Sequence, residues 1–410
     1  MKSNPKQYIA NYFTSFSCIG PDCEDHCCSN WTIYVDKEHY DWYQTDLFAP
    51  SCSVPKQFVK KNKEPERTEQ QYGIIELNDK GNCPCLTEGK LCQIHISYGL
   101  KGLPNVCRSY PRETIHVNGD QFEIGDLSCP EVTRLVLYSE ELPTFKQHLH
   151  TEASQLSPAK EYQINKNTYQ QIQQNIFHIL QQRQYPLVKR LLIIGVWMEV
   201  FTVVTQKETR GIQKGFKIAE REIQKYKHLQ APSNFRTDLL FWIPIIRDMY
   251  HHTDTNSRTG KRFIDCLEHW KEGMKIRDGA VEILEYNKNF KTAYQKKYIP
   301  FLHENTYVLE NYCAYYFQKN LFPYPPSSIS LQYMLFIIEF SLFSHLLIGI
   351  AASSGGLHAE ILIQLVQSYT KLVHHNPAYT SMLIDIHNSI HKKYKTYTNC
   401  LSFLLGFPTE

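Results

Sequence analysis

The sequence predicts a mainly α-helical protein in which a Cys-rich N-terminal module with short strands precedes an all-α helical domain. Ten of the thirteen cysteines lie among residues 1–129 and only three in the rest of the chain. From Cys129 onward, apolar residues recur with a period of about 3.6 rather than two, which is typical of helices. Since cysteine content and period change together, we expect two domains, residues 1–150 and 151–410.

Strand and turn signals mark the Cys-rich part. Apolar and polar residues alternate over residues 31–35, which predicts a half-buried strand, and Asp36 behind it predicts the N-cap of a short helix. Farther on, Asn118 and Gly119 separate two strand-like segments and form the residue pair that a type I′ hairpin turn requires. The charged stretch 50–71 is poor in apolar residues and predicts an exposed loop.

The rest of the chain shows helical patterns between Pro, Gly and Asn turns. Pro130 fits the first position of a helix, where its missing N–H leaves no hydrogen bond unmade. Further helices are predicted at residues 168–184, 187–206, 234–250, 260–275, 278–296, 308–320, 329–352, 357–374 and 378–394. The stretch 331–352 is long enough to cross a bilayer, but Glu339 and His345 within it favour a buried core helix, so we expect no stable membrane insertion.

The net charge limits the expected partners, and the N-terminal residues indicate the cellular compartment. The formal net charge is +3, and residues 1–129 hold 13 Lys and Arg against 17 Asp and Glu, so we expect no nucleic-acid partner. Residues 1–17 contain no continuous apolar run of seven or more, so we expect no secretory signal and a cytoplasmic location. Thiols stay reduced there, which favours metal binding or catalysis over disulfides.

The clustered cysteines form two groups, at residues 18–28 and 83–129. Structural zinc usually shows paired C-x₂₋₄-C knuckles, and no C-x₂-C occurs here, whereas an iron–sulfur cluster spreads its ligands more widely. Spacing therefore leaves iron–sulfur and zinc both open. His26 and His95 are close enough in sequence to be alternative ligands. The isolated cysteines are interpreted as buried small hydrophobes; these are Cys52, Cys266, Cys313 and Cys400.

The order of these motifs resembles the bacterial flagellin lysine N-methylase (FliB) family. The shared pattern covers about residues 18–131. It reads Cys18-x-Gly20-x-x-Cys23-x-x-x-Cys27-Cys28-x-x-Trp31-x-Ile33-x-x-Asp36, then Cys83-Pro84-x-Leu86, Cys92-x-Ile94, Cys107-x-x-Tyr110-Pro111-Arg112 and Cys129-Pro130-Glu131. More loosely, it resembles a broader group of zinc- or iron-chelating domains, so the resemblance alone does not fix the metal.

The resemblance implies methyl transfer from S-adenosylmethionine to lysine side chains of flagellin, in an enzyme with an iron–sulfur cluster of four irons; zinc is the alternative metal. Cys85 stands where the family usually has an apolar residue and is left out of the implied ligand set. That set is Cys18, Cys23, Cys27, Cys28, Cys83, Cys92, Cys107 and Cys129. The alternative function is a non-catalytic metal-binding or electron-transfer protein with zinc or iron.

The implied reaction also suggests residues for the methyl donor. Aromatic faces attract a sulfonium cation, which makes Trp31 and Tyr110 candidates, with ordinary core packing as the alternative. Arg112 could bind the donor's carboxylate in a bidentate manner, or pair instead with Glu131 or Asp126. Since no Gly-rich turn follows a predicted strand, we expect no Rossmann methyltransferase fold. The sequence identifies no catalytic residue.

Overall fold

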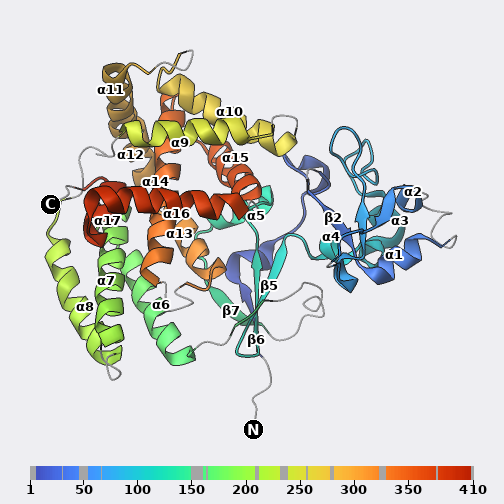
Figure 1. Ribbon diagram of the computed structural model, residues 1–410, viewed down its shortest axis with the longest axis horizontal. Helices are drawn as coiled ribbons and strands as arrows, with labels where there is room; N and C mark the ends of the chain where they lie inside the picture. Colours follow the sequence, from blue (N-terminus) through green and yellow to red (C-terminus); the bar gives the residue numbers. More distant parts are fainter. Residues whose placement is uncertain are drawn as a thin grey trace, which may run out of the picture.

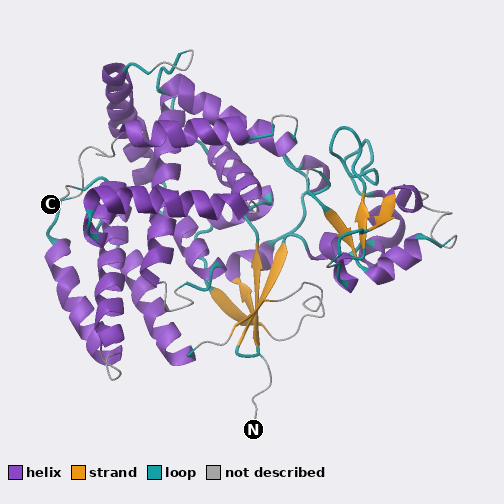
Figure 2. Ribbon diagram, in the orientation of Figure 1, coloured by secondary structure: helices purple, strands orange, loops and turns teal. Residues whose placement is uncertain are grey.

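The computed structural model confirms a mainly helical protein with two small sheets (Figures 1 and 2). It describes residues 6–29, 31–45, 54–65, 67–148, 160–162, 165–207, 212–230, 239–254, 257–277, 281–322, 329–374 and 377–407. Cys52 lies outside these ranges, as do the first residues of the helices predicted at 234 and 278.

One sheet has five strands, β1 (Gln7–Ala10), β5 (Arg112–Val117), β6 (Asp120–Gly125), β7 (Phe145–His148) and β8 (Lys160–Tyr162), in the order β7-β1-β6-β5-β8. β5 and β6 are joined by Asn118 and Gly119, whose φ angles of 52° and 83° confirm the predicted type I′ turn. The sheet mixes parallel and antiparallel pairs. In the described ranges, neither sheet has the parallel order of a Rossmann fold.

A smaller unit lies at the right of Figure 1, apart from the helical body. Its antiparallel sheet has the order β2-β4-β3, and the elements are β2 (Ile33–Val35), β3 (Val59–Lys61), β4 (Gly73–Ile75), α1 (Lys37–Tyr43), α2 (Val54–Phe58), α3 (Gln93–Tyr98) and α4 (Asn105–Ser109). The predicted cap at Asp36 is confirmed, because its side chain accepts a hydrogen bond from the His39 N–H. The predicted loop at 50–71 is wrong where it is described: it contains α2 and β3, and buried Val59 anchors β3 in the small core.

The helical domain contains α5 (Pro130–Leu137), α6 (Lys166–Leu180), α7 (Leu187–Lys207), α8 (Ile212–Lys227), α9 (Leu239–His252), α10 (Arg258–Gly273), α11 (Ile283–Ala293), α12 (Ile299–Glu304), α13 (Val308–Lys319), α14 (Ile329–Ser353), α15 (Ala359–Tyr369), α16 (Pro377–Tyr394) and α17 (Tyr397–Leu405). Pro130 takes the first position of α5, as predicted, and Cys129 occupies the N-cap position without a side-chain hydrogen bond. The predicted list lacks α8, α12 and α17. The apolar residues Phe216, Ala219 and Ile223 of α8 recur at helical spacing and do carry a helix signal, whereas α12 and α17 are only six and nine residues long.

α14 runs through the middle of the helical domain. Among the described residues it is the one helix whose length and hydropathy would suit a bilayer, and protein covers 94% of its most apolar window. Its polar side chains have partners inside the protein: the Tyr312 hydroxyl donates to Glu339 at 2.6 Å, and the Tyr286 hydroxyl lies 2.6 Å from His345 Nε2. Burial lowers the pKa of His345 to about 3, so this side chain is neutral. The prediction of a core helix is confirmed.

Two hydrophobic cores divide the molecule. The larger core joins the five-stranded sheet to the helices, with Ile9, Ile124 and Val132 packed among the helical residues. The smaller core lies under the three-stranded sheet and includes Cys83 and Cys85. The chain passes from the larger core to the smaller one after Cys18 and returns before β5. Cys129 therefore belongs to the larger core, whereas Cys83 and Cys85 belong to the smaller one. The domain boundary at residue 150 stays a prediction.

A buried ion triad fixes the packing of α7 and α13. Glu310 is fully buried and accepts from Arg183 Nη2 at 2.8 Å and from Arg190 Nη1 at 2.5 Å. Arg183 is about half exposed, whereas Arg190 is almost fully buried. A charge in this position is tolerated only while its partner is present.

We expect Glu310→Ala to destabilise the protein by about 3–5 kcal/mol, because Arg190 would remain buried without a counter-ion. The measurement is urea unfolding followed by tryptophan fluorescence. Glu222→Ala removes an exposed ion pair with Lys225 on α8 and should leave the midpoint unchanged. Equal midpoints for the two variants would contradict a structural role for the triad.

Candidate functional site

A cavity of about 800 Å³ lies where the small unit meets the five-stranded sheet and α5. This volume is within the usual range of ligand pockets. Nine cysteines line it: Cys18, Cys23, Cys27, Cys28, Cys83, Cys85, Cys92, Cys107 and Cys129. The structure therefore brings together all eight cysteines of the implied ligand set and adds Cys85, which the motif comparison had left out.

Backbone hydrogen bonds bring the cysteines of the small unit together. The Cys83 N–H donates to the Cys28 carbonyl at 2.8 Å, and the Gln93 N–H donates to the Cys85 carbonyl at 2.7 Å. Leu86 and Cys92 form an isolated antiparallel bridge. Cys28 and Cys83, which are 55 residues apart in sequence, thus become neighbours through main-chain pairing.

Short helices present two further cysteines to the cavity. Cys107 lies in α4, and Cys129 directly precedes α5. Asp36 links α1 to α4, because one carboxylate oxygen caps α1 while the other accepts from the Asn105 N–H at 2.9 Å. The place of Cys107 therefore depends on a side chain about 70 residues earlier.

The cavity thiols interact electrostatically in two overlapping sets. We call Cys27, Cys28, Cys83, Cys92 and Cys107 the inner set, since each interacts electrostatically with others in this group. We call Cys23, Cys27 and Cys129 the outer set, because the sulfurs of Cys23 and Cys27 both act on Cys129. Cys27 is the member that the two sets share.

Burial keeps most of these thiols protonated. It raises the pKa of Cys23 to about 11 and that of Cys129 to about 12, and it raises the pKa of Cys107 strongly. Cys27 and Cys83 are exceptions. The pKa of Cys27 falls to about 7 because the Cys28 thiol donates a hydrogen bond to it; burial opposes this shift and the charge of Lys371 supports it. The pKa of Cys83 is lowered by hydrogen bonds from Cys85, against the effect of burial. Several sulfurs could become thiolates only beside a compensating cation, which is the role of a bound metal.

Within the described residues, the cysteines do not form a finished metal site. None of the twelve described cysteines is in a disulfide. Across the same ranges, no three His, Cys, Asp or Glu side chains are placed to hold a metal ion. His26 and His95 also line the cavity. Cys266, Cys313 and Cys400 are fully buried among apolar residues, as predicted for cysteines without a ligand role.

The predicted aromatic residues lie on the cavity wall between the two cores. The rings of Trp31 and Tyr110 are 6.0 Å apart and inclined at 36°. Trp31 Nε1 donates to the Cys27 carbonyl at 2.6 Å, and the Tyr110 hydroxyl lies 3.1 Å from Ser128 Oγ. Burial raises the pKa of Tyr110, so the phenol is neutral. These contacts fix both rings beside cysteine-bearing segments.

Arg112 also lines the cavity, with its guanidinium over the rings of Phe13 and Phe16. The alternative partners expected for it, Glu131 and Asp126, are wrong. Glu131 pairs with Arg134 and Asp126 with Lys319, whereas Arg112 Nε lies 3.7 Å from Glu123 Oε1. Strand register explains this pairing. Arg112 is the first residue of β5, and Glu123 lies on β6, the strand paired with β5.

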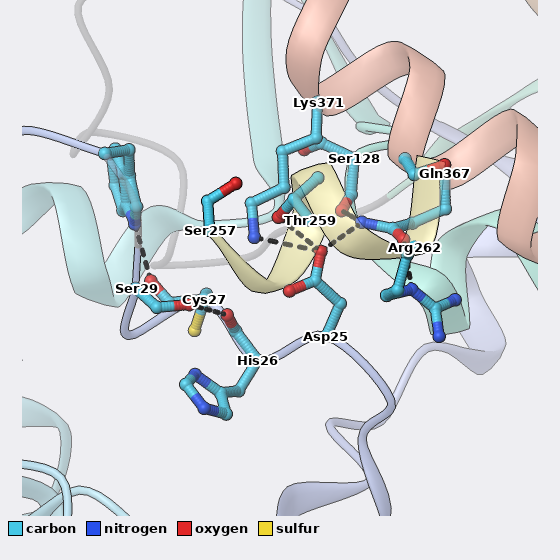
Figure 3. Close-up of polar contacts among 12 residues, drawn as sticks. Asp25, His26, Cys27, Ser29, Ser128, Ser257, Thr259, Arg262, Gln367 and Lys371 are labelled. Carbon is cyan, nitrogen blue, oxygen red and sulfur yellow. Dashed lines mark hydrogen bonds and ion pairs between the residues drawn. The ribbon is translucent and has the colours of Figure 1, made fainter. Parts of the chain in front are cut away.

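Two functional candidates escaped sequence reasoning. Glu123 lines the cavity, is 8% exposed, and has a pKa raised by burial and lowered in part by Arg112. Asp25 also lines the cavity and is held by side chains of the helical domain (Figure 3). Its position between Cys23 and Cys27 is a signal that sequence reasoning could have used. The strand that carries Glu123 offers no such signal.

Comparison with known proteins agrees with the cysteine pattern. The FliB lysine N-methylase C-terminal domain matches residues 173–403, which is more than half of the chain. The chain belongs to the FliB lysine N-methylase family. This assignment covers the helical domain, for which the motifs at residues 18–131 offered no test.

Relatives of this FliB family member come from Salmonella. The flagellar biosynthetic protein FliU of Salmonella muenchen is 34% identical over 130 residues, which are 31% of this chain and 73% of the relative. The lysine-N-methylases of Salmonella typhimurium and Salmonella choleraesuis are each 33% identical over 130 residues, or 31% of this chain. That alignment spans only 31% of either lysine-N-methylase. No solved structure matches the chain.

Replacing Asp36 by Asn should make the stability loss depend on pH. The pKa of Asp36 lies near 2, because hydrogen bonds from His39 and Asn105 outweigh burial, and the pKa of His39 is raised by its Asp36 partner despite burial. The Asp36 carboxylate adds to the free energy of unfolding above its ordinary pKa of about 4. Charged His39 adds to it below its ordinary pKa of about 6.5. Asp36→Asn should therefore cost about 1–2 kcal/mol near pH 5 and less at pH 2 or pH 8.

The measurement is thermal unfolding of wild type and variant across this pH range. Asp41→Asn, which loses an exposed ion pair with Lys37 on the same helix, is the matched control and should show a flat profile. A loss for Asp36→Asn that is equal at all three pH values would contradict the ionic contribution.

Proposed function

We propose that the protein is a cytoplasmic protein-lysine N-methyltransferase that methylates flagellin lysines with S-adenosylmethionine at the cysteine-lined cavity. Three findings support this: the family assignment, the lysine-N-methylase and flagellar names of its relatives, and the gathering of nine cysteines with Trp31, Tyr110 and Arg112 around one space. The last observation carries the proposal, because it joins a soft-metal donor set to groups suited to a sulfonium ligand.

Residues on the cavity wall suit the individual chemical groups of the methyl donor. The faces of Trp31 and Tyr110 suit the sulfonium cation. The Arg112 guanidinium is steadied by two phenylalanine rings and suits the donor's carboxylate. The cavity volume is sufficient for a ligand of nucleoside size.

The donor chemistry of the cavity fits an iron–sulfur cluster, since every strong soft ligand in it is a thiol. We assign three ligands of a four-iron cluster to the inner set, which would leave one iron without a cysteine, and zinc is the alternative metal. When bound, the cluster supplies an iron position that can hold the amino and carboxylate groups of the donor. Cys18, Cys23 and Cys129 then support the wall of the cavity.

Methyl transfer requires a neutral lysine nitrogen. The lysine ammonium gives its proton to a base, the nitrogen lone pair forms a bond to the methyl carbon, and the carbon–sulfur bond breaks with its electron pair left on sulfur. A buried carboxylate with a raised pKa suits this proton transfer. Glu123 has both properties and faces the cavity.

Glu123→Gln should lower the turnover rate by about 100-fold or more while methyl-donor binding changes little. In the wild type, the rate should fall at low pH as Glu123 becomes protonated, and the variant should lose this acidic limb. Glu131→Gln is the matched control, because Glu131 lines the same cavity but is paired with Arg134. A normal rate and pH profile for Glu123→Gln would exclude Glu123 as the base.

The function is tested by incubating anaerobically purified protein with flagellin and methyl-labelled S-adenosylmethionine. Labelled methyl-lysine in flagellin is the expected product, detected by mass spectrometry. The purified protein should be brown and contain iron with acid-labile sulfide. A colourless protein with stoichiometric zinc and no methyl-lysine would instead support the non-catalytic metal-binding alternative.

The ligand assignment has its own test. Cys107→Ser should lose most of the iron, because Cys107 is a member of the inner set. Cys266→Ser should keep it, because Cys266 is buried in the helical core. Iron content and the visible absorption spectrum of both variants give the result, and the opposite pattern would overturn the assignment.

A further inference from the structure

Asp25, which lies between Cys23 and Cys27, is hydrogen-bonded by side chains of the helical domain. Asp25 is 1% exposed, and its Oδ2 accepts three hydrogen bonds. The donors are Thr259 Oγ1 at 2.8 Å on α10, Gln367 Nε2 at 2.8 Å on α15, and Lys371 Nζ at 3.1 Å in the π-helical turn after α15. Figure 3 shows the three donors converging on one carboxylate oxygen. A charged side chain so deeply buried holds its segment firmly in place.

Gln367 also reaches the second cysteine segment. The same Nε2 donates to the Ser128 carbonyl at 2.9 Å, and Ser128 immediately precedes Cys129. At the other end of the amide, Oε1 accepts from Arg262 Nε at 3.3 Å. Gln367 is 0% exposed, so the side chain has a fixed orientation. One amide therefore spans the two segments that carry the outer set.

A second buried contact holds the Cys129 segment. Lys319 on α13 donates to Asp126 Oδ2 at 2.8 Å, and Asp126 Oδ1 accepts from the Ser128 N–H at 2.8 Å. The helical domain thus contacts the residues next to Cys129 from α13 as well as from α15. In contrast, the cysteines of the small unit are arranged by that unit's own backbone pairing.

We propose that Gln367 and Lys371 are positioning residues that hold Cys27 and Cys129 at a fixed separation in the cavity. The cluster role of Cys27 rests on the proposed function, but the positioning itself does not. Because Cys27 belongs to both sets, its position links the outer set to the inner one. The helical domain therefore completes a site whose cysteines all lie outside the residues that match the family's C-terminal domain.

The test compares the wild type with the variants Gln367→Ala and Lys371→Met. Each protein is the full chain, reduced and free of metal. Pulsed alkylation with iodoacetamide and mass spectrometry reports each cysteine separately. Cys23 should react about tenfold faster in both variants, and Cys27 and Cys129 should do so in Gln367→Ala, because buried hydrogen bonds that hold their segments are lost. Cys83 and Cys92 should react as in the wild type.

Gln364→Ala is the matched control. Gln364 lies one turn from Gln367 on α15 and donates to the Arg262 carbonyl at 2.8 Å without touching Asp25. It should leave all alkylation rates unchanged. Unchanged rates at Cys23, Cys27 and Cys129 in both test variants would overturn the proposal. A rise that extends to buried Cys266 in both would also overturn it, since the contacts would then support the whole fold.

Reconstitution with iron and sulfide adds a spectroscopic readout. Gln367→Ala and Lys371→Met should show an altered visible absorption spectrum and less iron, and Lys371→Arg, which keeps the charge and the donors, should restore both. No rescue by Lys371→Arg would count against positioning by the ion pair. If the wild type binds no iron while the alkylation pattern holds, the positioning stands and the proposed cluster fails.

Discussion

Burial of the negative charge of Asp25 is the constraint on which the site depends. A carboxylate that is 1% exposed needs donors, and the segment between Cys23 and Cys27 supplies none of the three that it has. They come from α10, α15 and the turn after it, more than 230 residues later. Burial alone would raise the pKa of Asp25, but the charge of Lys371 and the hydrogen bonds lower it, so the carboxylate stays ionised. The position of the cysteine segment therefore depends on side chains of the helical domain.

The cysteines around the cavity are positioned in two different ways. In the small unit, main-chain hydrogen bonds fix the positions of the cysteines, and the hydrophobic core beneath them includes Cys83 and Cys85. On the other side, side chains of the helical domain set the segments of Cys27 and Cys129. A change in the angle between the two units would alter the distance between these groups more than the distances within either.

Local patterns predicted the local structure well. The residue pair at 118 and 119, the cap at Asp36 and the first helical position at Pro130 each express a rule that acts within a few residues, and each is confirmed. The motif order predicted the cysteines that share the cavity, although their role as ligands is still a prediction. Cys85, left out of the implied ligand set because the family usually has an apolar residue there, lines the cavity and is also part of the small core, and its lack of a ligand role stays a prediction. Arg112 pairs with Glu123 because of strand register, and Gln367 meets Asp25 across 342 residues. No local pattern encodes such distant contacts.

The polar residues inside α14 also bear on how the chain is made. During synthesis, residues 329–353 emerge as an apolar segment long enough for a bilayer, before α16 and α17 exist to cover it. Glu339 and His345 each add to the cost of insertion, by about 2–3 kcal/mol for a charged side chain at mid-bilayer. Their partners Tyr312 and Tyr286 lie earlier in the chain and are already present when α14 appears. The partners of the two polar side chains in α14 are therefore synthesised before the helix itself.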